Sequence, residues 1–361
     1  MRLLLAAMVA AAAAAAERRS GKRHVSLVNA PTQPDDSPVA TTPGNIMWLG
    51  MFNEAEPSNI SAAAFTAQRP FANLFFHWNV SVLLEIHERF HPNKPGLFLS
   101  MQTWGVWHIP ALKWRNQNET GLTPHWRDLL NRGLAEAEPH LRSGVLSGIF
   151  LGDELATQGI PFENITSVAD AIQQTLAKTG GLVYLNEGTG PFDPEHEVYA
   201  GTWGAHMPSS LDLFSIDDYC LLRPDKFNVG WANCSDPAAE AQRVELFLAQ
   251  HVKPRMAPHQ RLLAVPGLFL DANVSRSGPL AEQEQLMIRK LDAYYDWARR
   301  DPLVIGLNNW HWTTLPDHRH DVQSIPFYWG VDHMATLQHR LAQIGRLVNN
   351  SDVVQVSLNN G

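Results

Sequence analysis

Short apolar runs alternate with longer amphipathic stretches along most of the chain. Eight runs rich in branched and aromatic residues have the length of strands, and they span residues 46–52, 72–78, 96–102, 144–154, 182–187, 211–219, 262–270 and 304–312. Stretches with the apolar spacing of helices span residues 80–90, 124–141, 162–178, 237–252, 279–300 and 334–348, and a shorter one lies around 62–68. Pro124, Pro237 and Pro279 mark three helix starts, where a missing N–H leaves no hydrogen bond unmade.

The order of these elements predicts the fold. Eight strands, most of them followed by a helix, are typical of an α/β protein with a single-domain (β/α)8 TIM barrel, here over residues 44–350. A doubly wound sheet is the alternative. It is disfavoured because no glycine-rich phosphate-binding turn follows the first strand, where Gly50-Met51-Phe52-Asn53 stands.

Polar residues collect where the predicted strands end. The fourth strand is an apolar run that ends abruptly in Asp153 and Glu154, and strand periodicity places Glu154 on the inward face with Phe150. Active sites of such barrels lie at the carboxyl ends of the strands. We therefore expect the mouth to contain Gln102, Asp153, Glu154, Glu187, Asp217, Asp218, Tyr219, Asn308, Trp310 and His311, with Trp104 and His77 beside them.

This set of side chains suits a carbohydrate. Carboxylates can transfer protons and stabilise an oxocarbenium-like transition state, and indoles can stack on the apolar face of a sugar ring. Glu154 is the predicted general acid/base and Asp217 the predicted partner, with Glu187 as the second choice for that partner. Ordinary core packing explains at least half of the twelve Trp residues, and Trp104 and Trp310 are the ones assigned to binding.

The chain resembles the TIM-barrel glycoside hydrolase superfamily at two motifs. Gly152-Asp153-Glu154 looks like the Asp-Glu pair of hexosaminidase-type enzymes, and this likeness implies that Asp153 orients an acetamido group while Glu154 is the acid. Asn308-Asn309-Trp310-His311-Trp312 looks like the Trp-bearing last strand of many such barrels. Three features depart from the pattern, and one is the absence of a chitinase-like Asp-x-Asp-x-Glu run, whose Asp positions hold Phe150 and Gly152. Phe150-Leu151-Gly152 replaces the His-x-Gly-Gly lead-in, and the seventh strand ends Gly267-Leu268-Phe269-Leu270-Asp271 without the Glu of the large retaining clan.

Composition and sequons indicate a secreted or lumenal glycoprotein, extracellular or in a lysosome or vacuole. Residues 1–16 have the pattern of a signal peptide, and 17–43 that of a disordered linker or pro-segment. Residues 351–361 form a C-terminal tail, and Cys220 and Cys234 are expected to form a disulfide. Predicted glycosylation sites are Asn59, Asn79, Asn118, Asn164, Asn233, Asn273 and Asn349.

The remaining expectations concern partners. The net charge of −8 argues against nucleic acid, and no segment has the length and apolarity to span a membrane. We expect a carbohydrate substrate and no cofactor, and the oligomeric state is left open.

Two other functions compete with a glycosidase. His87-Glu88-Arg89-Phe90-His91 matches the zinc-protease signature His-Glu-x-x-His, although Pro92 ends the helix at once and no third ligand is evident. A barrel that binds a glycan without cleaving it is the second alternative. Non-catalytic barrels of this kind usually lose the catalytic acid, so the presence of Glu154 favours an enzyme over a binding protein.

Overall fold

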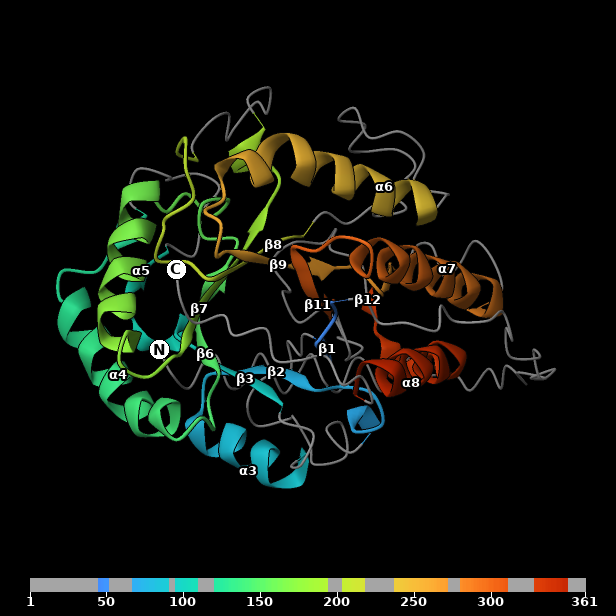
Figure 1. Cartoon of the computed structure of the whole chain (residues 1–361), viewed down its shortest axis with the longest axis horizontal. Coiled ribbons are helices and arrows are strands. Elements are labelled where there is room, and N and C mark those ends of the chain that lie inside the picture. Colours follow the sequence, from blue (N-terminus) through green and yellow to red (C-terminus); the bar gives the residue numbers. More distant parts are fainter. Residues whose placement is uncertain are drawn as a thin grey trace, which may run out of the picture. The chain divides into compact units, whose positions relative to one another are not determined.

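The computed structural model describes residues 45–51, 67–90, 95–109, 120–193, 203–217, 237–271, 280–310 and 328–349. Within them, eight parallel strands form a closed barrel in the order β1-β11-β9-β8-β7-β6-β3-β2, which confirms the predicted (β/α)8 fold (Figure 1). The barrel strands are β1 (Trp48–Met51), β2 (Leu74–His77), β3 (Gly96–Ser100), β6 (Gly148–Asp153), β7 (Leu182–Gly188), β8 (Leu213–Asp217), β9 (Arg261–Val265) and β11 (Val304–Asn309).

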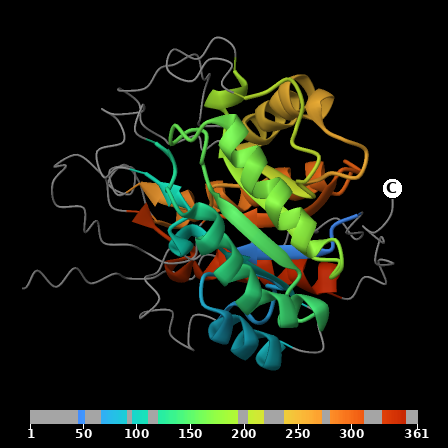
Figure 2. The ribbon, with the colours of Figure 1, turned by 90° about the vertical axis from the view of Figure 1, so that its left-hand side faces the viewer.

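Helices surround this barrel, and Figure 2 shows α4 and α5 crossing its outside. Their bounds are α3 (Val80–Phe90), α4 (Trp126–Arg142), α5 (Phe162–Leu176), α6 (Pro237–Phe247), α7 (Leu280–Ala298) and α8 (Ala335–Asn349). A π-helical turn (Leu248–Val252) and a 3₁₀ turn (Lys253–Arg255) extend α6, so that the helical segment ends close to the predicted boundary. Two small antiparallel pairs complete the described strands: β4 (Trp107–His108) with β5 (Gly121–Leu122), and β10 (Leu270–Asp271) with β12 (Tyr328–Trp329).

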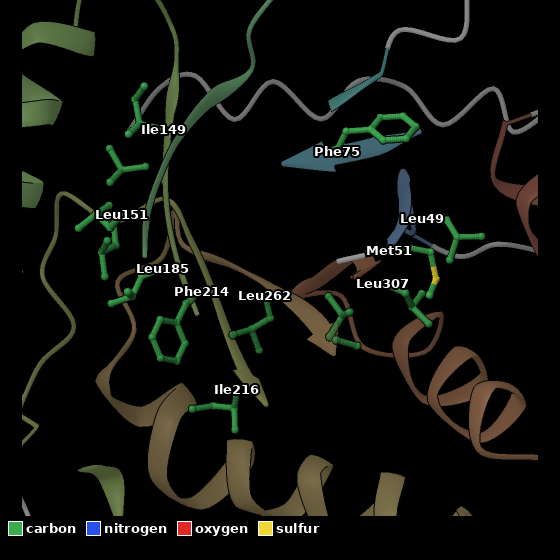
Figure 3. Packing of buried hydrophobic residues seen from close by; sticks show 14 of the residues in the cluster. Leu49, Met51, Phe75, Ile149, Leu151, Leu185, Phe214, Ile216, Leu262 and Leu307 are labelled. Atoms are coloured by element: carbon green, nitrogen blue, oxygen red, sulfur yellow. The ribbon is translucent and has the colours of Figure 1, made fainter. Parts of the chain in front are cut away.

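Two separate apolar layers stabilise the barrel. Side chains that alternate along each strand face either the helices or the barrel axis. Leu49, Phe75, Ile149 and Leu185 belong to the outer layer, between sheet and helices (Figure 3). The inner layer is largely aromatic and includes Trp48, Phe76, Phe98, Phe150 and Tyr184. Phe150 and Tyr184 stack in it with ring centroids 4.9 Å apart.

One side chain reinforces the joint between β1 and β2. Strands β1 and β2 share one registered residue pair, Gly50 with Leu74, whereas β1 and β11 share four registered pairs. The buried amide of Asn73 supplements the joint, since its Oδ1 accepts a hydrogen bond from Leu49 N (2.8 Å) and its Nδ2 donates one to Met47 O (3.0 Å). Replacing Asn73 would leave both backbone groups unpaired in the barrel wall.

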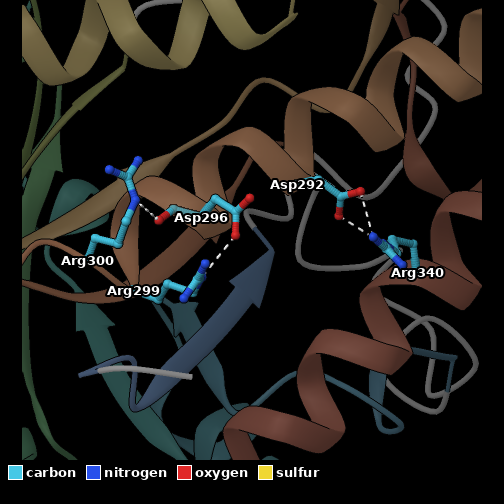
Figure 4. Close-up of polar contacts among 5 residues, drawn as sticks. All are labelled: Asp292, Asp296, Arg299, Arg300 and Arg340. Carbon is cyan, nitrogen blue, oxygen red and sulfur yellow. Dashed lines mark hydrogen bonds and ion pairs between the residues drawn. The ribbon is translucent and has the colours of Figure 1, made fainter. Parts of the chain in front are cut away.

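Ion pairs tie the outer helices together. Arg340 Nε and Nη2 of α8 donate to the two carboxylate oxygens of Asp292 on α7, at 2.8 and 2.7 Å (Figure 4). At the end of α7 itself, Arg299 pairs with the Asp296 carboxylate, and Arg300 donates to the Asp296 backbone carbonyl. A second interhelical pair is almost fully buried, and it joins Lys290 of α7 to Glu240 of α6.

Gly148 lies where the barrel wall has no room for a side chain. A Cβ atom built there would lie 2.1 Å from Leu182 O and 2.8 Å from Phe98 Cε1. Because the first contact is with backbone, Gly148→Ala is expected to lower the free energy of unfolding by about 3 kcal/mol, at the upper end of overpacking effects. Denaturant midpoints measure this. The matched control is Gly121→Ala, whose nearest neighbour is the movable Asn164 side chain at 3.3 Å, and an equal loss in both variants would contradict the steric explanation.

Several predictions lie outside the described residues: the signal peptide, residues 17–43, the tail, and both cysteines. Most of the short helix around 62–68 lies there too. Among the helices that the structure describes, none has the length and apolar character needed to span a membrane.

Candidate active site

Carboxylates gather at the carboxyl ends of three adjacent barrel strands. Asp153 is the last residue of β6, Glu154 follows it, and Asp217 ends β8. Strand β7 lies between them and carries Glu187 and Gly188 at its end. Register pairs Asp153 with Asn186 and Gly188 with Asp217, so the structure places these acids side by side at one sector of the barrel mouth.

Glu154 has an unusual backbone. Its φ of +49° places it in the left-handed region, and it is the one non-glycine residue with positive φ in the described part of the chain. Such a conformation costs on the order of 1–2 kcal/mol for a residue with a Cβ atom, and residues of this kind concentrate at functional sites. The register of β6 against β7 also shifts between Phe150 and Asp153, immediately before Glu154.

A directed chain of hydrogen bonds crosses the barrel interior and ends on Asp153. Asn186 Nδ2 donates to Asp153 Oδ1 (2.6 Å), and Ser215 Oγ donates to Asn186 Oδ1 (2.5 Å). Ser215 has one hydroxyl hydrogen, so the Tyr184 hydroxyl donates in turn to Ser215 Oγ (2.7 Å). Burial raises the pKa of Tyr184, while the interactions with Ser215 and Asn308 oppose this. Every donor in the chain points towards Asp153, so its carboxyl group is the final acceptor of the chain.

The surroundings of Asp217 raise the pKa of its carboxyl group. Burial raises the pKa of Asp217 well above its ordinary value, and the neighbouring carboxylates of Glu154, Asp153 and Glu187 raise it further. A hydrogen bond with Asn186 opposes the shift. Like charges this close cannot all ionise freely, so the Glu154–Asp217 pair retains a proton to higher pH than an isolated carboxylate would.

Glu187 faces the loop that follows Glu154. Its Oε1 accepts a hydrogen bond from Ala156 N (2.7 Å), and its Oε2 is 3.3 Å from Thr157 N and 3.4 Å from Thr157 Oγ1. Burial raises the pKa of Glu187 well above its usual range, with the Glu154 and Asp153 charges adding to the shift and the two backbone donors opposing it.

Asn308 and Trp310 occupy the far side of the mouth. Asn308 is fully buried and lies near the Tyr184 hydroxyl. Trp310 is half-buried and packs on the inner aromatic layer, and its backbone N–H donates to Pro266 O (3.0 Å). Trp310 thus combines a fixed backbone with a partly exposed indole, as a surface for sugar stacking requires.

Other predicted binding residues lie in more local surroundings. The buried His77 accepts a hydrogen bond from Asn79 N at Nδ1 (2.9 Å), stacks on Trp78, and has its pKa lowered by burial. Gln102 is exposed in a 3₁₀ turn (Gln102–Trp104), and Trp104 packs closely against Gly133 of α4. Asp218, Tyr219 and His311 lie outside the described residues.

Three of the predicted glycosylation sites fall within the described residues. Asn79 is exposed and its Oδ1 accepts from Ser81 N (2.8 Å), so this side chain caps α3. Asn164 and Asn349 are half-buried in α5 and α8. Glycosylation of these three stays a prediction, as it does for the four sequons at Asn59, Asn118, Asn233 and Asn273.

Residues 87–90 of the zinc-protease motif belong to α3, on the outside of the barrel. His87 belongs to α3, whose buried residues Leu83 and Ile86 pack it onto the barrel, and His91 falls outside the described residues. Among the residues that the structure describes, no three His, Cys, Asp or Glu side chains are grouped so that they could hold a metal ion.

The raised pKa values predict how stability depends on pH. Above the ordinary pKa values of 3.8 for Asp217 and 4.5 for Glu187, the unfolded chain releases protons that the folded protein still binds at these two groups. The free energy of unfolding therefore falls as pH rises above these values. The lowered pKa of His77 acts in the opposite sense through pH 6.5. We therefore expect Asp217→Asn to be more stabilising at pH 7.5 than at pH 4.5 when thermal midpoints of variant and wild type are compared. A pH-independent difference would contradict the raised pKa of Asp217.

Comparisons with known proteins support the fold. No protein-family model matches the chain, and no curated protein matches its sequence. Among solved structures, GH5_18 from Bifidobacterium longum shares 11% identity over 84% of this chain and 80% of its own, with a TM-score of 0.53. A second structure of GH5_18 from that organism, in complex with Manβ1-4GlcNAc, shares 10% identity over 83% and 78%, with a TM-score of 0.50. A family 17 β-1,3-glucanosyltransferase from Rhizomucor miehei shares 12% identity over 80% and 92%, with a TM-score of 0.47.

The structure therefore resembles TIM-barrel glycoside hydrolases, as the motifs predicted. At identities this low the likeness establishes the fold, and the chemistry has to be argued from the site itself.

Proposed function

We propose that this protein is a secreted glycoside hydrolase in which Glu154 is the general acid/base and Asp217 its partner. The observation that carries the proposal is the left-handed backbone of Glu154 at the end of β6, beside an acid on β8 with which it is electrostatically coupled. A strained residue persists where its surroundings fix it, and here it presents a carboxylate at the barrel mouth.

The reaction would proceed as follows. The protonated Glu154 carboxyl donates its proton to the glycosidic oxygen as the C1–O bond breaks. In a retaining enzyme, the proton that the pair retains lies on Glu154, so that the ionised Asp217 carboxylate attacks C1 to form a glycosyl ester; the Glu154 carboxylate left after proton donation then removes a proton from the water that hydrolyses the ester. In an inverting enzyme, Asp217 instead takes the proton of the attacking water. Asp153, held in place by the hydrogen bond from Asn186, would bind a hydroxyl or acetamido group of the sugar, and Trp310 would stack on the sugar ring.

Hydrolysis of an aryl glycoside panel tests the proposal. The panel includes N-acetylhexosaminides, because of the Asp153-Glu154 pair, and β-mannosides, because one structural neighbour is seen with Manβ1-4GlcNAc. Anomeric NMR of the first product distinguishes retention from inversion. With an activated aryl glycoside, azide added to Asp217→Ala should restore turnover and give a glycosyl azide of inverted configuration if Asp217 is the nucleophile, whereas azide added to Glu154→Ala should give a glycosyl azide of retained configuration if Glu154 is the acid/base; the opposite configurations would show that the two roles are exchanged. A pure, folded protein that hydrolyses none of these and no natural glycan would refute the proposal.

A non-catalytic glycan-binding barrel is the second candidate, and one observation favours it. The segment from Val265 to Phe269, at the end of β9, carries no carboxylate. Glycan binding of equal affinity in wild type and Glu154→Gln, without hydrolysis by either, would support this second function.

A further inference from the structure

The loop after β6 is fastened to β7 by the Glu187 carboxylate. Glu187 is fully buried, and both of its oxygens are used by the loop: Oε1 by Ala156 N at 2.7 Å, and Oε2 by Thr157 N and Oγ1. Burial shields these hydrogen bonds from water, so the loss of their acceptor would leave buried donors unpaired. The peptide immediately beyond Glu154 is therefore held at a defined place on β7.

Glu154 itself is fixed from both sides. Its N–H donates to Asn186 O on β7 (2.9 Å), and its carbonyl oxygen accepts from Gln158 N (2.7 Å). The Gln158 side chain also donates to Asp153 O (2.6 Å). A left-handed residue needs such redundant restraint, because without it the backbone relaxes to an unstrained conformation.

The two carboxylates lie on opposite sides of β7. Period-two alternation places Gly188 on the face of Asn186 and Glu187 on the other. A Cβ atom built on Gly188 would lie 3.2 Å from Glu154 Oε1, so the Glu154 carboxylate is on the Gly188 side. Glu187 approaches the same loop from the opposite face, where it binds backbone.

We propose that Glu187 is a positioning residue that holds Glu154 in its left-handed conformation by binding Ala156 and Thr157. In this proposal Glu187 is a hydrogen-bond acceptor for the loop, an alternative to its prediction as the second choice for the partner of Glu154. The effect on turnover rests on the proposed function, whereas the effect on the loop is independent of it.

Hydrogen–deuterium exchange tests the loop directly. In Glu187→Ala the amides of Ala156 and Thr157 lose their acceptor, and exchange at these two amides is expected to accelerate at least about tenfold, as for the loss of a buried hydrogen bond. Glu187→Gln keeps a carbonyl oxygen for Ala156 N and should stay close to wild type. Unchanged exchange in Glu187→Ala would overturn the proposal, whether or not the protein proves to be a glycosidase.

Kinetics test the consequence for Glu154. Misplacing a catalytic group by about 1 Å can lower kcat about 100-fold, so Glu187→Ala should lose activity on this scale at unchanged KM. Glu187→Gln should keep kcat within about fivefold, the effect of one weakened hydrogen bond. If Glu187→Gln is as inactive as Glu187→Ala while its loop exchanges like wild type, Glu187 takes part in proton transfer and the proposal fails.

Two further variants complete the design. Glu138→Ala removes an exposed carboxylate that pairs with Arg142 on α4, and it should change neither exchange at 155–158 nor kcat. Gly188→Ala introduces a methyl group 3.2 Å from Glu154 Oε1 and 2.9 Å from Thr157 Oγ1. It should lower kcat by displacing these side-chain ends, and it provides the test if Glu187→Ala does not fold. A wild-type kcat in Gly188→Ala would show that turnover does not depend on how the Glu154 and Thr157 side chains are held, and it would contradict the proposal.

Discussion

Glu154→Gln is expected to lower kcat about 10²- to 10⁴-fold on substrates with poor leaving groups, the contribution of a positioned general acid. The substitution keeps size and shape but removes the transferable proton. A dinitrophenyl glycoside needs no protonation as it leaves, so its rate of bond cleavage should fall much less. Steady-state kinetics on a series of aryl glycosides measures this as a steeper dependence on leaving-group pKa. Equal losses across the series would contradict the role of general acid.

Glu154→Gly provides a matched control for the conformation. It removes the carboxylate as well as the Cβ atom that makes φ of +49° unfavourable. We expect it to be inactive but more stable than Glu154→Gln by about 1–2 kcal/mol, because glycine adopts the left-handed region without strain. A glycine variant less stable than the glutamine variant would show that contacts of the side chain outweigh the strain.

Lys290→Met is expected to destabilise the protein by about 3–5 kcal/mol, the range for breaking a buried ion pair by removing one partner. Lys290 Nζ lies 2.8 Å from Glu240 Oε2 and donates to Gly267 O (3.1 Å), and the Tyr294 hydroxyl donates to Glu240 Oε1 (3.1 Å). The substitution leaves a buried carboxylate with its main counter-charge gone. Urea unfolding measures the loss of free energy.

Two comparisons separate the ion pair from packing. Arg142→Met breaks the exposed pair with Glu138 and should change stability by less than about 1 kcal/mol. Combining Lys290→Met with Glu240→Leu removes both charges and should recover much of the loss, because neither charge is then buried alone. A double variant as unstable as the sum of the two single ones would contradict this account.

The sequence predicted the order of strands and helices well, because buried parallel strands and amphipathic helices leave patterns that local packing rarely overrides. All eight barrel strands and six helices fall within the predicted ranges or within two residues of them. The seventh predicted strand, over 262–270, was too long. Strand β9 ends at Val265, and Pro266 lacks the N–H needed to continue the ladder, after which Gly267 forms a bridge with Trp310.

The site was predicted less completely. Glu187 was chosen for its carboxylate, although the alternation along β7 places Tyr184 and Asn186 on the inward face. Asn186 and Tyr184 form the polar chain with Ser215, and a strict use of this alternation would have identified them. The left-handed backbone of Glu154 could not have been predicted, because it depends on hydrogen bonds from β7 and from residues 156–158.

The uneven pairing of β1 has a consequence for biosynthesis. Its four registered partners belong to β11, and Asn309 Nδ2 of β11 donates to Gly50 O across 259 positions of the chain. At translation rates of about 5–20 residues per second, β1 waits on the order of 10 to 50 s for this partner to be made. In the nascent chain β1 meanwhile lacks β11, and β2 with Asn73 supplies its one strand neighbour. The first strand of the barrel to be synthesised thus acquires its main neighbour last, and chaperones that bind extended apolar segments have that interval in which to act.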